Sequence, residues 1–151
     1  YLLKGEQKMK TYYDYLEEST NVVRSNTNRN KIITMLSYLL IWAVAMIVFW
    51  FFTSGSDAMG YSLMFLCILP ITTFVVSIII GKNDFWRKGK WAITLFFGVM
   101  YMLAEYGTFK MANNIAFDKL NAPAWGMVVA GTIISTIGML VGSLFNKQMN
   151  K

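Results

Sequence analysis

The sequence predicts an all-α membrane protein: a four-transmembrane-helix bundle with an N-terminal amphipathic cytoplasmic helix. Two observations lead to this fold class: apolar residues gather in four long blocks, and basic residues gather between alternate blocks. The 151 residues are 56% hydrophobic and 15% charged, whereas soluble domains average about 45–50% apolar and roughly 25% charged residues. The uncharged blocks cover residues 32–53, 61–81, 91–104 and 122–146.

The part before the first block, residues 1–31, is predicted to be a cytoplasmic juxtamembrane segment. Within it, residues 9–25 have an amphipathic helical pattern, because the charges of Asp14, Glu17 and Glu18 lie off an apolar stripe. The stripe consists of Met9, Tyr12, Tyr13, Leu16, Ser19 and Val23. Residues 26–30 are predicted to be a polar linker. Two roles stay open for the helix, namely lying on lipid headgroups and acting as a docking or regulatory helix.

Each apolar block is long enough to cross a bilayer as a helix. About 20 residues at 1.5 Å per residue match a hydrocarbon core of about 30 Å, and backbone polar groups in lipid must be satisfied within the helix. The predicted spans are residues 32–53, 61–81, 91–109 and 124–145. Together they form a transmembrane domain of residues 32–146, followed by a cytoplasmic tail of residues 147–151.

Basic residues predict the orientation of the spans. Twelve of the 14 lie in the N-terminal segment, in residues 81–90 or in the C-terminal tail, and only Lys110 and Lys119 lie in the other connections. The positive-inside rule therefore predicts that both termini are cytoplasmic. A predominance of lysine over arginine and the absence of an N-glycosylation sequon fit a multi-pass protein of a bacterial inner (plasma) membrane.

Composition also limits the chemistry that we expect. The chain has no histidine and a single cysteine, Cys67, which lies inside an apolar block. These counts exclude histidine-dependent catalysis, histidine-bearing zinc sites and an intrachain disulfide. We therefore expect no catalytic residues, no cofactor, no metal and no nucleic-acid partner.

Glu105 is the first candidate for a functional residue, because a carboxylate inside a membrane helix is energetically costly. It belongs to a stripe with spacings of three and four that also contains Thr94, Gly98, Tyr101 and Thr108. We expect this stripe to face other helices, with the Tyr101 hydroxyl donating to the Glu105 carboxyl. The site would bind a proton or a cation; in the alternative, Glu105 is a tolerated residue at the membrane interface.

Pro70 is predicted to kink the second span, because it lacks a backbone donor and leaves the carbonyl of Leu66 unpaired. Transporters use such breaks to expose carbonyls to ions, so Pro70 and the nearby Thr73 are included in the candidate ion site. In the alternative interpretation, threonine hydroxyls simply satisfy the freed carbonyl.

The fourth span carries a small-residue face that predicts close helix packing. The face consists of Gly131, Ser135, Gly138 and Gly142. Small residues let two helix backbones approach each other, and the partner helix belongs either to this chain or to a second subunit. We expect Met139, one position away, to face lipid or a looser contact.

These features predict a non-enzymatic integral membrane protein that acts through helix–helix contacts. It would work as an oligomer, by self-association, or as an accessory or regulatory subunit of a second membrane protein. The alternative is a small proton- or cation-coupled transporter or channel centred on Glu105.

Overall fold

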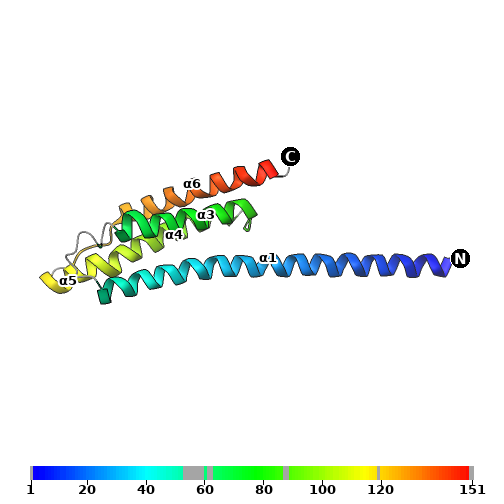
Figure 1. Cartoon of the computed structure of the whole chain (residues 1–151), viewed down its shortest axis with the longest axis horizontal. Coiled ribbons are helices and arrows are strands. Elements are labelled where there is room, and N and C mark those ends of the chain that lie inside the picture. The colour runs from blue at the N-terminus through cyan, green and yellow to red at the C-terminus, as the bar shows by residue number, and fades with distance from the viewer. Residues whose placement is uncertain (1, 53–59, 61–62, 87–88, 119, 150–151) are drawn as a thin grey trace. The chain divides into compact units, whose positions relative to one another are not determined.

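The structure, a computed structural model, describes residues 2–52, 60, 63–86, 89–118 and 120–149; these are almost entirely helical and contain no strand. The elements are α1 (Leu2–Phe52), η1 (Leu63–Ile68), α3 (Leu69–Asn83), α4 (Lys90–Glu105), η3 (Tyr106–Lys110), α5 (Met111–Phe117) and α6 (Trp125–Met149) (Figure 1). Four stretches are long and apolar enough to cross a membrane: Met9–Phe52, Leu63–Asn83, Lys90–Phe117 and Trp125–Gln148. The boundary residues 53 and 61–62 of the first two predicted spans lie outside the described residues.

The linker predicted at residues 26–30 is wrong, because α1 continues unbroken through this segment. The segment contains neither glycine nor proline, and each of its residues costs a helix at most about 0.7 kcal/mol relative to alanine. The Thr27 hydroxyl donates to the carbonyl of Val23 at 2.9 Å and so stays with its own helix. Because starting a new helix after a break is costly, weak helix formers between two strong segments remain helical.

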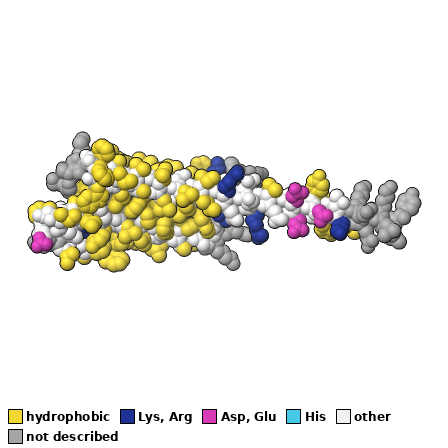
Figure 2. All heavy atoms as spheres, turned by 90° about the horizontal axis from the view of Figure 1, so that it is seen from below, with side chains coloured by type: hydrophobic (Ala, Val, Ile, Leu, Met, Phe, Trp, Pro, Cys, Tyr) yellow, Lys and Arg dark blue, Asp and Glu magenta, His cyan; other side chains and the backbone are white. Residues whose placement is uncertain are grey.

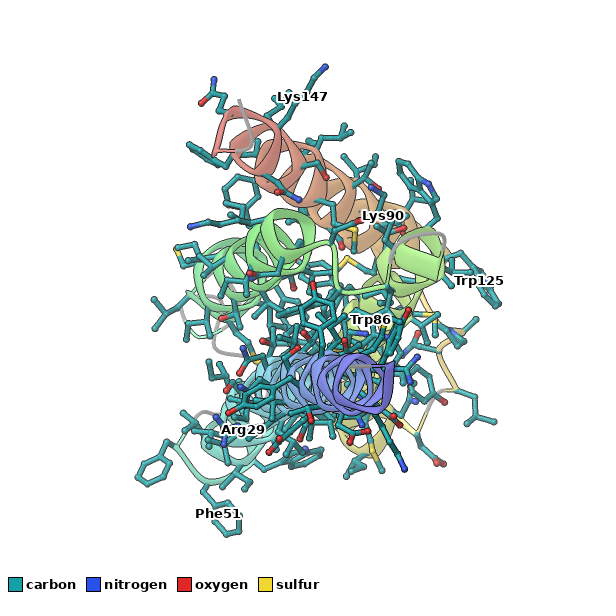
Figure 3. The ribbon with its side chains drawn as sticks, turned by 90° about the vertical axis from the view of Figure 1, so that its right-hand side faces the viewer. Arg29, Phe51, Trp86, Lys90, Trp125 and Lys147 are labelled. Atoms are coloured by element: carbon teal, nitrogen blue, oxygen red, sulfur yellow. The ribbon has the colours of Figure 1, made fainter. Side chains whose placement is uncertain are left out.

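The chain divides into two compact units, one ending at residue 33 and the other beginning at residue 34. In the first unit, the side chains of residues 9–25 are all exposed. In the second unit, apolar side chains cover most of the visible surface of the packed helices (Figure 2). Phe51 and Trp125 are 80% and 73% exposed, and both side chains point away from the helices around them (Figure 3).

In the second unit, α6 packs against both α3 and α4, which contact each other much less (Figure 1). The small-residue face makes these contacts, and all four of its residues are buried. A Cβ atom added to Gly142 would lie 2.2 Å from the carbonyl oxygen of Ile78 in α3. One added to Gly131 would lie 2.8 Å from the Cβ of Tyr101 in α4. The partner helices of this face therefore belong to the same chain.

The helices that face α6, namely α3 and α4, also carry small residues where the backbones meet. A Cβ on Gly81 of α3 would lie 2.3 Å from the Met139 carbonyl oxygen, and one on Gly98 of α4 would lie 2.5 Å from that of Val128. Met139 is only 2% exposed, so the expectation that it faces lipid or a looser contact is wrong. Because α6 lies close to α3, the Met139 side chain is packed inside a hydrophobic core that also contains Tyr38 and Ile80.

Residues 34–52 of α1 pack through large side chains instead of small ones. The rings of Tyr38 and Phe97 lie 4.6 Å apart, centroid to centroid. The indole nitrogen of Trp42 donates to the carbonyl of Met100, and that of Trp50 donates to the carbonyl of Gly107, both at 3.1 Å. These two bonds connect α1 to α4 and η3 along the length of the unit.

The glycine contacts of α6 lead to a paired prediction. Gly142→Ala should destabilise the fold by about 1–3 kcal/mol, because the added methyl overlaps a backbone carbonyl. Gly126→Ala is the matched control, since a Cβ there meets nothing within 4 Å. Thermal unfolding of both purified variants in one detergent gives the comparison, and equal melting temperatures would contradict the packing described for α6.

Candidate functional site at a buried carboxyl group

Six polar or charged residues are buried in the described part of the chain: Thr73, Ser77, Thr94, Glu105, Thr108 and Ser135. Four of them have hydroxyl groups that form hydrogen bonds within the protein. The hydroxyls of Thr94 and Thr108 donate to carbonyls of their own helix, at Trp91 (2.7 Å) and Ala104 (2.6 Å). The hydroxyls of Ser77 and Ser135 bind each other at 2.8 Å between α3 and α6.

Glu105 differs from these four bonded residues, because its buried Oε2 atom has no hydrogen-bond partner, a property that it shares with the hydroxyl oxygen of Thr73. The residue is 8% exposed and lies at the end of α4. Lys110, five residues further along the chain, donates from its ammonium group to the carbonyl of Ala122 at 2.6 Å. Burial of an unpaired carboxyl oxygen opposes folding, so this group is available to hold a proton or a ligand.

The expected hydrogen bond from Tyr101 to Glu105 is wrong, because the Tyr101 hydroxyl donates to the backbone carbonyl of Phe65. Phe65 lies in η1, a π-helical segment. In a π-helix, each carbonyl accepts from the amide five residues later, and for Phe65 that residue is Pro70, which has no N–H. The Tyr101 hydroxyl replaces the missing donor.

This geometry adds to the role expected of Pro70. In the π-helical register the Phe65 carbonyl also loses the amide donor at Pro70, and Tyr101 of another helix supplies a donor to it. The hydroxyl of Thr72, two residues after Pro70, donates to the carbonyl of Ile68 at 2.7 Å. It therefore does not bond to the Leu66 or the Phe65 carbonyl.

Two π-helical segments adjoin the candidate site. The segment η3 begins at Tyr106, directly after Glu105, and η1 is connected to it through aromatic rings. The centroids of Phe65 and Phe109 are 6.2 Å apart, and those of Phe49 and Phe109 are 4.9 Å apart. Such single π-helical turns are rare and occur frequently at functional sites.

The structure brings together only part of the predicted ion site. Glu105, Tyr101 and Thr108 share the end of α4 and the start of η3, and Tyr101 connects them to the break at Pro70. Thr94 lies eleven residues from Glu105, which corresponds to about 16 Å along a helix. Thr73 interacts instead with Tyr38, although neither hydroxyl oxygen has a hydrogen bond of good geometry.

Sequence reasoning missed Tyr38 and Phe65, and it noted Ser77 after Pro70 without including it in the candidate site. A signal existed for Tyr38, as a polar ring tip inside the first apolar block. No signal existed for Phe65, because it takes part through its backbone carbonyl.

The chemistry that this arrangement allows is narrow. Among the residues that the structure describes, no three histidine, cysteine, aspartate or glutamate side chains group together as a metal site. One carboxyl group near backbone carbonyls is suited to carry a proton or to contact a small cation. No family model matches this chain, and no curated protein or solved structure shows significant similarity to it.

The bond between Tyr101 and Phe65 leads to a double-mutant prediction. Tyr101→Phe should destabilise the fold by about 1–3 kcal/mol, because a buried carbonyl loses its donor. The cost should shrink in a Pro70→Ala background, since alanine supplies an N–H to the same carbonyl. Thermal unfolding of the four proteins measures the coupling, with Tyr106→Phe as a control one turn away. Strictly additive effects would show that Tyr101 does not compensate for Pro70.

Proposed function

We propose that this chain is a multi-pass integral membrane protein whose four apolar helices form a transmembrane bundle with both termini in the cytoplasm. The four helices of sufficient length and apolarity support this proposal. The basic residues of the second unit support the orientation. Lys82 lies in the last turn of α3, with its backbone nitrogen beside Gly142 of α6. Lys147 lies in the last turn of α6. Lys90 begins α4 and lies 3.7 Å from Asp84, just after α3. These three lysines therefore share one end of the unit, as the positive-inside rule requires of a cytoplasmic end.

The topology is tested by labelling with a membrane-impermeant thiol reagent in intact cells. In a Cys67→Ser background, Asn121→Cys should react from outside and Asn83→Cys should react only after permeabilisation. The reason is that Asn83 lies at the lysine-bearing end of α3, whereas Asn121 lies in the connection between α5 and α6. Labelling of Asn83→Cys from outside would reverse the orientation.

We propose further that the protein acts through helix–helix contacts, as an oligomer or as an accessory subunit of another membrane protein. The observation that carries this proposal is one exposed face of α1, on which no side chain is charged. The face consists of Met9, Tyr12, Leu16, Ser19, Val23 and Asn26. The small-residue face of α6 is not available for such contacts, because α3 and α4 occupy it.

The mass of the full chain in lipid particles extracted directly from the native membrane tests this function. We expect a mass that is a multiple of the 17.3 kDa chain, or a defined complex with a second protein. Cross-linking in the membrane before extraction excludes association during purification. A monomer with no cross-linked partner would contradict the proposal.

A second candidate function is a proton- or cation-binding site at Glu105, as in a small transporter or channel. The buried Oε2 atom of Glu105, which has no hydrogen-bond partner, favours this function. Tyr101 and Thr108 bind backbone carbonyls, so a ligand at Glu105 would not have to displace their hydrogen bonds.

The test compares wild type, Glu105→Gln and Glu105→Leu by thermal unfolding in detergent from about pH 5 to 9, the range in which perturbed carboxyl groups titrate. If Glu105 exchanges a proton in the folded state, the difference in melting temperature between wild type and Glu105→Gln should vary with pH, because glutamine does not ionise. A constant difference, together with a stable Glu105→Leu, would remove Glu105 from this function.

A further inference from the structure

We infer that residues 9–30 of α1 pair with the same residues of a second copy of this chain, as a parallel two-stranded coiled coil. The inference rests on the proposed helix-contact function and names its partner. The parallel direction follows from the proposed topology together with the continuity of α1, which runs without a break from residue 9 into the first apolar stretch. In two copies with the same topology, this helix runs toward the membrane in the same direction.

The first argument is a seven-residue repeat on an exposed helix. Counting from Met9 as position a, the same position is occupied by Leu16, Val23 and Asn30. Position d is occupied by Tyr12, Ser19 and Asn26. The side chains of Met9, Leu16 and Val23 are 58%, 44% and 65% exposed. The a positions form one of the two lines of side chains that two supercoiled helices bury between them, and on the d line Tyr12 supplies an aromatic ring beside two small polar residues.

The second argument is the distribution of charge around the helix. Six of the seven charged residues between positions 9 and 31 fall at b, c or f, the positions farthest from a partner; they are Lys10, Asp14, Glu17, Glu18, Arg24 and Lys31. Arg29, at position g, is the exception. Pairing with a second copy therefore brings no like charges face to face across the a and d layers, which would otherwise oppose self-association.

The third argument favours a second copy over a lipid surface. Helices that lie on anionic headgroups have a polar face rich in lysine and arginine. Residues 9–30 contain three basic side chains, Lys10, Arg24 and Arg29, and equally many acidic ones, Asp14, Glu17 and Glu18, so no lysine- and arginine-rich face is present in this segment. Asn30 at position a also fits a coiled coil, because an asparagine in one a layer fixes the register and favours two strands.

Cysteine cross-linking of the full chain in lipid membranes tests this interface. In a Cys67→Ser background, single cysteines replace Leu16 or Val23 at position a, and Asp14 or Asn21 at position f. Position a brings two copies within disulfide distance and position f does not, so we expect roughly 10-fold more covalent dimer from the a positions. Equal yields at a and f, or no dimer at a, would overturn the inference.

Paired charge substitutions give an independent measure. Leu16→Glu should convert the dimer to a monomer, because it places two carboxylates in one a layer, whereas Asn21→Glu adds the same charge on the outer side and should keep the dimer. If wild type is oligomeric but the a positions do not cross-link, the inference fails and the helix-contact function stands. If wild type is a monomer without any partner, the function itself fails. Quenching of a fluorophore at residue 16 by nitroxide-labelled lipid would assign this face to the membrane instead.

Discussion

The contact between backbones on the small-residue face of α6 is the constraint on which the rest of the second unit depends. In the proposed membrane setting, hydrophobic burial between apolar helices adds little, and close approach of backbones supplies dispersion energy instead. At Gly142 and Gly138 the carbonyl oxygens of Ile78 and Phe74 occupy the space that a Cβ atom would need. This contact fixes the level of α3 against α6. The contacts of Gly131 with Gly98 and Tyr101 fix the level of α4 in the same way.

Once α4 is fixed by these contacts, the position of Tyr101 decides how α3 is built around Pro70. A proline inside a helix leaves a carbonyl without its amide donor. The Tyr101 hydroxyl reaches the carbonyl of Phe65, so the cost of the break is offset by a side chain of another helix. The π-helical turn before Pro70 is thus supported by a tertiary hydrogen bond as well as by its own backbone.

The sequence predicts these elements unequally, for physical reasons. Charge-free blocks and the spacing of small residues depend on composition and period, and they predicted the all-helical fold with four long apolar helices. The π-helical segments η1 and η3 could not be predicted, because a wider turn is decided by whether another helix offers a donor or a ring, as Tyr101 and Phe109 do. The continuous α1 was missed because five polar residues resemble a linker, although none of them breaks a helix. Which oxygen Tyr101 reaches is likewise a tertiary property.

The Ser77–Ser135 pair and Glu105, two of the buried polar features of the second unit, differ in what their removal would leave behind. This difference bears on the candidate functions. Ser77 and Ser135 bind each other, so replacing either one leaves a buried hydroxyl unpaired, which is the behaviour of a structural contact. The buried Oε2 atom of Glu105 has no hydrogen-bond partner, so removing that oxygen breaks no hydrogen bond. Burial of the Oε2 atom opposes folding, and no hydrogen bond to it offsets the cost. A carboxyl group held in this way can gain a partner only by taking up a proton or a ligand, and this is the physical basis on which a binding role for Glu105 stands beside a role in helix contacts.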